Sequence, residues 1–173
     1  IQKVWRGERP QEGRYREFTQ ADIDIVAQDE LPFHFDVEVA QVMAEALAGL
    51  PVPELTLQIS NRKVLEGFYL GLGIAEPPAV MQVVDKLDKI PPDAVASQLR
   101  GLGLTDDQAS ACLALAEIAT PDTSFVERVR ELGVTHELLE TGLSELAQVV
   151  GSTRSIEGVT VMADLRIARG LDY

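Results

Sequence analysis

Four arginines surround one short loop near the start of the chain: Arg6, Arg9, Arg14 and Arg16. An aromatic side chain, Phe18, follows them. Guanidinium groups are planar forks that hold phosphate and carboxylate oxygens through paired hydrogen bonds. Arginines that alternate with an aromatic residue around one loop therefore predict a local site for a polyanionic ligand. A charged turn in solvent is the alternative explanation of the same residues.

These side chains belong to a predicted β-hairpin with a charged tip. Residues 2–7 are predicted as one strand, residues 8–13 as a polar loop with a proline and a glycine, and residues 15–26 as the second strand. On that second strand Gln20 and Asp24 lie four residues apart, so we expect them to share one face.

The rest of the chain predicts helices and strands in an α+β order. We expect a helix at residues 36–49, a strand at 55–59, a helix at 63–72 and a return to strand at 158–168. Between the last two, residues 77–151 contain four or five helical segments separated by proline and glycine. This order favours an antiparallel β-sheet with helices on one face over a doubly wound parallel sheet.

The change from mixed strands and helices to consecutive helical segments, and back to a strand, divides the chain into three predicted parts. Residues 1–76 form a segment of a sheet-based core that carries the arginine loop, and residues 77–151 form a helical insertion domain. Residues 152–173 then return to the core.

The overall charge narrows the class of protein. A formal net charge of −13 argues against a nonspecific nucleic-acid binder, which needs a basic face to displace counterions from phosphates. The single cysteine, Cys112, lies in an apolar run, so we expect a buried, inert thiol and a reducing, cytoplasmic setting. No apolar run reaches the length that spans a bilayer, so no membrane association is expected.

Other candidate signals receive structural explanations. The spacing of Gly67, Gly71 and Gly73 matches no phosphate-binding loop, and we expect these glycines to end a helix. His136 is expected at a surface or capping position, and the charge run at residues 85–89 on a solvated helix face. No histidine pair has metal-ligand spacing, so no metal site in the protein is expected.

Two motifs make a family resemblance specific. Residues 6–20 (Arg-Gly-Glu-Arg-Pro-Gln-Glu-Gly-Arg-Tyr-Arg-Glu-Phe-Thr-Gln) resemble the second signature motif of class II aminoacyl-tRNA synthetases, in the wording of the histidyl member. Residues 168–173 (Ala-Arg-Gly-Leu-Asp-Tyr) resemble the start of the histidine-specific motif. Residues 59–67 and 84–89 are also similar to some members. The resemblance covers essentially the whole chain and implies part of the class II catalytic core with a helical insertion domain.

The resemblance implies ATP-dependent activation of histidine, followed by transfer to tRNA. Arg6 matches the arginine that bridges the α-phosphate of ATP and the amino-acid carboxylate. Glu8 matches the acid that recognises the adenine amino group, and Phe18 the aromatic on which adenine stacks. Arg14 and Arg16 match the contacts to the outer phosphates. Mg²⁺ is expected to arrive with the nucleotide.

The same resemblance implies the histidine contacts. Gln20 and Asp24 match the positions that hold the amino group and the imidazole of the substrate, and Asp24 stands where many members carry glutamate. Arg169 matches a second catalytic arginine that faces the α-phosphate opposite Arg6. Tyr173 is the first tyrosine of the histidine-specific motif.

Three loop residues, Arg9, Gln11 and Glu12, would approach the acceptor end of tRNA(His), and the helical insert would clasp the acceptor stem. The chain begins with Ile1 and shows neither the family's first and third motifs nor its anticodon-binding domain. We therefore expect an internal fragment that cannot aminoacylate alone, from an enzyme that is a homodimer at full length. The alternatives are a histidine-binding regulatory paralogue of histidine biosynthesis and a non-catalytic helical module that binds RNA or a partner.

Overall fold

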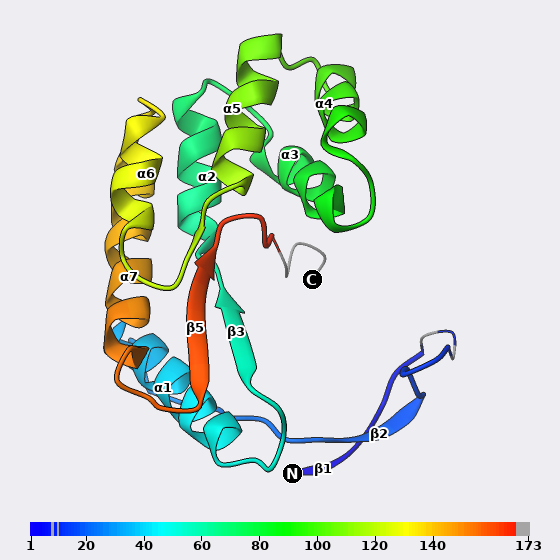
Figure 1. Ribbon diagram of the computed structural model, residues 1–173, viewed down its shortest axis with the longest axis vertical. Coiled ribbons are helices and arrows are strands. Elements are labelled where there is room, and N and C mark those ends of the chain that lie inside the picture. The colour runs from blue at the N-terminus through cyan, green and yellow to red at the C-terminus, as the bar shows by residue number, and fades with distance from the viewer. Residues whose placement is uncertain (8, 10, 169–173) are drawn as a thin grey trace.

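The structure, a computed structural model, describes residues 1–7, 9 and 11–168 (Figure 1). Its strands are β1 (Gln2–Trp5), β2 (Glu17–Gln20), β3 (Leu55–Ile59), β4 (Ala119–Thr120) and β5 (Val159–Asp164). Its helices are α1 (His34–Ala48), α2 (Arg62–Gly71), α3 (Pro77–Val84), the 3₁₀ helix η1 (Asp85–Asp88), α4 (Pro92–Gly101), α5 (Asp106–Ala116), α6 (Phe125–Glu131) and α7 (Glu137–Thr153).

The predicted hairpin is present. Strands β1 and β2 pair antiparallel, with Val4 opposite Phe18, and the Arg6 amide extends the ladder by donating to the Arg16 carbonyl at 2.9 Å. Gly13 has a φ of 74°, a left-handed conformation that suits glycine because it lacks a Cβ. In Figure 1 the hairpin stands apart from the helices and joins them through a long extended segment.

The second strand of the hairpin is shorter than the sequence predicts. We expected strand from residue 15 to residue 26, and β2 ends at Gln20. In the observed register Gln20 pairs with Gln2, and the pairing of β1 with β2 ends there. Residues 21–27 have no regular secondary structure, although polarity alternates from Ala21 to Ile25, because alternation by itself supplies no backbone hydrogen-bond partner.

A second, mixed sheet has the strand order β3-β5-β4. Strand β5 pairs antiparallel with β4, whereas it pairs parallel with β3, in a register that sets Leu57 opposite Val161. One face of the β3–β5 pair packs against α1, where Ala44 is fully buried beside Val161. The α+β class is confirmed, with antiparallel pairing in β1–β2 and β4–β5 and a parallel pairing between β3 and β5.

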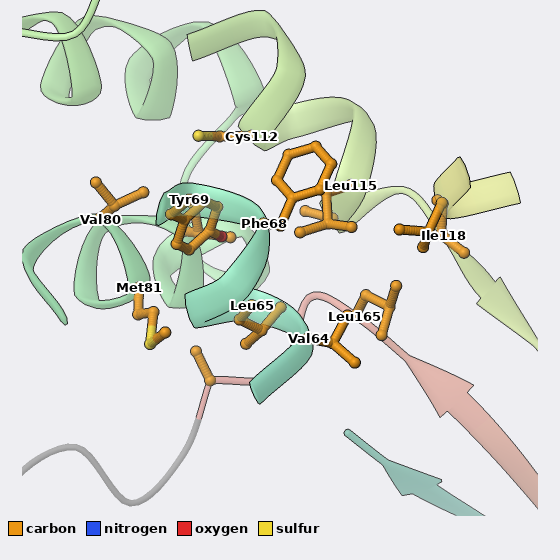
Figure 2. Packing of buried hydrophobic residues seen from close by; sticks show 14 of the residues in the cluster. Val64, Leu65, Phe68, Tyr69, Val80, Met81, Cys112, Leu115, Ile118 and Leu165 are labelled. Carbon is orange, nitrogen blue, oxygen red and sulfur yellow. The ribbon is translucent and has the colours of Figure 1, made fainter. Parts of the chain in front are cut away.

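The main apolar core lies among the helices. Phe68 and Tyr69 of α2 are fully buried, and Figure 2 shows them between the helix that carries Val80 and the helix that carries Cys112 and Leu115. The cluster includes side chains on both sides of residue 77, from α2 to the end of β5. The proposed division of the chain at residues 77 and 152 stays a prediction.

Helices α2 and α7 approach closely because each of them carries a glycine where it contacts the other. A Cβ added to Gly67 would lie 2.3 Å from the Leu139 backbone nitrogen, and one added to Gly142 would lie 2.6 Å from the Val64 nitrogen. Real Cβ contacts are not that short, so any side chain at these positions would force the helices apart. Gly67 therefore lies inside α2, whereas Gly71 and the left-handed Gly73 end it as expected.

Local signals place several helix ends. The Thr105 hydroxyl and the Gln108 side chain form a reciprocal capping box at the start of α5. His136 caps α7 by accepting the Leu138 amide, which confirms its expected structural role. Cys112 is buried as predicted, and this burial raises the pKa of its thiol to about 12. Within the described residues no helix is both long and apolar enough to cross a membrane.

Candidate functional site

Three of the predicted site residues meet on one face of the hairpin. The Arg6 guanidinium carbon lies 5.1 Å from the centroid of the Phe18 ring, and Arg6 Nη2 donates to Gln20 Oε1 at 3.2 Å. The pairing register causes this, because every second residue along a strand points to the same side, and Val4 pairs with Phe18 while Gln2 pairs with Gln20. A cation over an aromatic face is attracted by the quadrupole of the ring.

A shallow pocket opens next to this face. Its volume is about 380 Å³, and it is lined by Arg6, Gly13, Arg14, Tyr15 and Phe18. Two guanidinium groups and two aromatic rings in one hollow can hold a ligand that combines phosphates with a flat base. Arg16, the remaining predicted phosphate contact, is exposed on the adjoining segment.

Gln20 is held from both ends of its amide. Its oxygen accepts from Arg6, and its Nε2 donates to Asp22 Oδ1 at 2.6 Å. The sequence did not single out Asp22, whose side chain orients the amide. Asp24 is exposed in the segment after β2, so a shared strand face does not connect it to Gln20. Its expected role now depends on the family resemblance alone.

The opposite face of the hairpin carries a separate polar contact set. Glu17 accepts from Lys3 Nζ at 2.5 Å and from Trp5 Nε1 at 2.9 Å. These two donors lower the pKa of the Glu17 carboxyl, with Lys3 contributing most. Because this face is directed away from Arg6 and Phe18, it offers control positions for experiments on the site.

The other predicted residues fall into two groups. Arg9, Gln11 and Glu12 are exposed on the hairpin loop, where Gln11 and Arg14 form an isolated antiparallel bridge. The expected roles of Glu8, Arg169 and Tyr173 concern positions outside the described residues.

A polar cluster that the sequence did not reveal lies at the end of β5. Asp164 is 1% exposed and accepts hydrogen bonds from Gln58 and Arg166. Arg166 Nη1 also lies 3.4 Å from Asp88 Oδ1, so the charge run at residues 85–89 is not only a solvated face. These residues are far apart in sequence, so no motif indicates their contact.

No group of three or more histidine, cysteine or acidic side chains suited to a metal ion occurs in the described part of the chain. The expectation that Mg²⁺ arrives with the nucleotide stays a prediction, which agrees with the preference of this ion for phosphate oxygens.

The structure shows an antiparallel hairpin lined by arginines in an α+β chain, and residues 6–20 of this hairpin resemble the second motif of class II aminoacyl-tRNA synthetases. The family model described as histidyl-tRNA synthetase matches residues 1–173. The chain therefore belongs to the histidyl-tRNA synthetase family.

Several relatives agree with this assignment. The chain is 56% identical over 174 residues to the histidine–tRNA ligase of Thermobifida fusca and 56% identical over 174 residues to that of Micrococcus luteus. All of the chain is aligned in both comparisons, with 40% and 38% of the two relatives respectively. The chain thus spans about two fifths of the length of the curated relatives that it matches.

Two solved structures share the fold. The crystal structure of histidyl-tRNA synthetase from Nostoc sp. PCC 7120 matches with a TM-score of 0.84 and 28% identity, over 100% of this chain and 40% of that one. An ATP phosphoribosyltransferase regulatory subunit/histidyl-tRNA synthetase from Bacillus halodurans C matches with a TM-score of 0.66 over 82% of this chain and 37% of that one. At 17% identity, this second match shows the fold alone.

Proposed function

We propose that the protein carrying these residues is a histidine–tRNA ligase that activates histidine with ATP and transfers it to tRNA(His). The observation that carries the proposal is the meeting of Arg6, Phe18 and Gln20 on one face of the hairpin, beside a pocket of about 380 Å³. Membership of the histidyl-tRNA synthetase family supports the same activity.

The chemistry of activation explains why arginines surround this pocket. A carboxylate oxygen of histidine attacks the α-phosphorus of ATP, a new P–O bond forms, and the bond to the pyrophosphate leaving group breaks. Two anions must approach each other, so catalysis depends on positioning and on neutralising charge. The planar fork of Arg6 suits this step because it can donate to the α-phosphate and to the carboxylate together.

Arg6 must change partners when the nucleotide binds. In the structure its guanidinium lies over Phe18 and donates to Gln20. Adenine and a guanidinium cannot occupy the same face of one ring, so we propose that stacking of adenine on Phe18 releases Arg6 toward the α-phosphate. Gln20 then keeps its bond to Asp22 and presents its freed amide oxygen to the amino group of histidine.

The remaining roles in the proposal follow the family pattern. Glu8 would recognise the adenine amino group, and Arg14 and Arg16 would hold the outer phosphates with their Mg²⁺. Asp24 would bind the imidazole of histidine. The remaining positions complete the substrate site: Arg169 would act opposite Arg6, and Tyr173 would line the histidine pocket.

The proposed partners extend beyond the small substrates. Exposed Arg9, Gln11 and Glu12 would approach the acceptor end of tRNA(His), and the helical region at residues 77–151 would contact the acceptor stem. We further propose that the full-length enzyme is a homodimer that works in the cytoplasm.

Calorimetric titration with Mg-ATP, with and without histidine, tests the nucleotide site in this chain. We expect Arg6→Ala to weaken binding by roughly tenfold to a hundredfold, the cost of losing hydrogen bonds to a charged group. Lys3→Ala is the matched control, because it removes a cation from the opposite face of the same strand. Equal binding by the wild-type chain and by folded Arg6→Ala would contradict the assignment of Arg6.

Histidine-dependent ATP–pyrophosphate exchange by a full-length protein that carries these residues tests the activity itself. Exchange supports the ligase. Histidine binding without exchange would favour a regulatory paralogue. The isolated 173 residues are not expected to charge tRNA.

A further inference from the structure

The end of strand β5 is held by a buried carboxylate. Asp164, its last residue, accepts at Oδ1 from the Arg166 amide at 3.0 Å. Its Oδ2 accepts from Gln58 Nε2 at 3.1 Å and from Arg166 Nη2 at 3.0 Å. Both oxygens are therefore bonded, which a carboxylate that is 1% exposed requires.

Arg166 connects this strand end to the helical region. One arm of its guanidinium bonds Asp164, and Nη1 of the other arm lies 3.4 Å from Asp88 Oδ1. Asp88 ends η1, which follows α3 directly. A single arginine therefore joins β5 to a helical element that is distant in sequence, through the two arms of one rigid group.

The same contacts set the direction in which the chain leaves β5. The Asp164 side chain caps the Arg166 amide, and the Ile167 amide donates to the Asp164 carbonyl at 3.4 Å, so the strand ends in a turn. Leu165 and Ala168 are buried on either side of this turn. Leu165 packs near Val64 and Ile118 of the core (Figure 2). The next residue in the sequence after Ala168 is Arg169.

We infer that Asp164 and Arg166, clamped to Asp88, are positioning residues that fix how residues 165–168 leave β5 relative to the helical region, directly before the position of Arg169 in the sequence. This inference rests on the proposed function, in which Arg169 acts opposite Arg6. The Asp164–Arg166 pair adds little net stability, because Arg166 is 40% exposed and the Coulomb attraction mainly offsets the cost of desolvating the buried Asp164 carboxylate. Its main effect is geometric, since it fixes one orientation of the turn.

Steady-state kinetics of ATP–pyrophosphate exchange by the full-length protein tests the inference. We expect Arg166→Met to lower kcat by about tenfold or more, because misplacement by about 1 Å can cost far more than that. The KM for ATP should stay within about twofold, because the hairpin supplies most of the proposed nucleotide contacts. Arg166→Lys should recover part of the loss, since an ammonium can reach a carboxylate but lacks the second arm.

Two further variants separate positioning from folding. Asp88→Asn removes only the outer, solvent-exposed partner, so the protein should remain folded while kcat falls in the same direction. Arg130→Met is the matched control: Arg130 also bridges two carboxylates, Glu127 at 3.0 Å and Glu140 at 2.8 Å, far from the end of β5 in sequence. We expect this control to leave kcat unchanged, because ATP–pyrophosphate exchange does not involve the tRNA that the helical region is proposed to contact.

Hydrogen exchange on the 173-residue chain supplies a readout besides activity. Arg166→Met and Asp88→Asn should speed exchange of the amides at residues 165–168, whereas Arg130→Met should not. If folded Arg166→Met had the kcat of the wild type and unchanged hydrogen exchange, the inference would be overturned, while the proposed ligase function would be unaffected. Absence of ATP–pyrophosphate exchange in the full-length wild-type protein would instead reject the proposed function.

Discussion

The β1–β2 hairpin carries charged and aromatic side chains on strands of four residues, whereas the helices from α2 to α7 enclose fully buried apolar side chains. In the hairpin Trp5 is 68% exposed and Phe18 is half-buried, while Phe68 in α2 has no exposed surface. The helical region therefore supplies most of the buried apolar surface, whereas the hairpin side chains contact mainly one another and include the proposed ligand contacts.

The largest effect should come from one substitution made in both regions. Phe68→Ala removes a fully buried ring, and we expect it to lower the free energy of unfolding by about 3–5 kcal/mol. Phe18→Ala should cost below about 1 kcal/mol, because the ring is only half-buried, yet it should abolish Mg-ATP binding. Urea unfolding and calorimetry measure the two quantities. A similar loss of stability in both variants would break the comparison.

A smaller effect should follow from crowding the α2–α7 contact. Gly67→Ala places a Cβ 2.3 Å from the Leu139 nitrogen, and we expect a loss of about 1–3 kcal/mol. Gly151→Ala in α7 is the control, because nothing lies within 4 Å of its added Cβ. That variant should gain about 0.5–1 kcal/mol from better helix propensity. Urea unfolding that finds Gly67→Ala as stable as the wild type would reject the close approach of the helices.

The smallest effect concerns the pH response of the hairpin. Lys3 and Trp5 lower the pKa of Glu17, so their contacts add stability above the unfolded pKa and lose it as the pH falls through the folded pKa. Trp5 is the single tryptophan, so its fluorescence should report this titration with a midpoint below that of an ordinary glutamate. Lys3→Met should move the midpoint upward. An unmoved midpoint would show that Lys3 does not perturb Glu17.

Several structural features were predictable because their causes are local. The signals for the two hairpin strands and for the loop between them depend only on neighbouring residues. The hydroxyl of Thr105 likewise caps a helix that begins at the next residue. The hairpin, the helix starts and the α+β class follow from such signals. The burial of Cys112 follows from the apolar run around it.

The features that were missed depend on contacts between distant segments. Polarity alternates up to Ile25, but β2 ends at Gln20, where its pairing with Gln2 of β1 ends. The parallel pairing of β3 with β5 depends on how the chain crosses between them, which periodicity does not encode. Likewise, the role of Asp88 could not be read from a charge run, because its partner Arg166 belongs to another element.

The sequence by itself determined which functional groups the hairpin carries and to which family the chain belongs, because both depend on residue identity and on short spacings. Only the tertiary structure decided which of these side chains contact one another. Arg6 meets Gln20 through the strand register, and Asp164 meets Gln58 and Arg166 at the end of β5. The first contact depends on strand pairing at the surface, whereas the second depends on long-range packing, because the buried Asp164 needs hydrogen-bond partners from other parts of the chain.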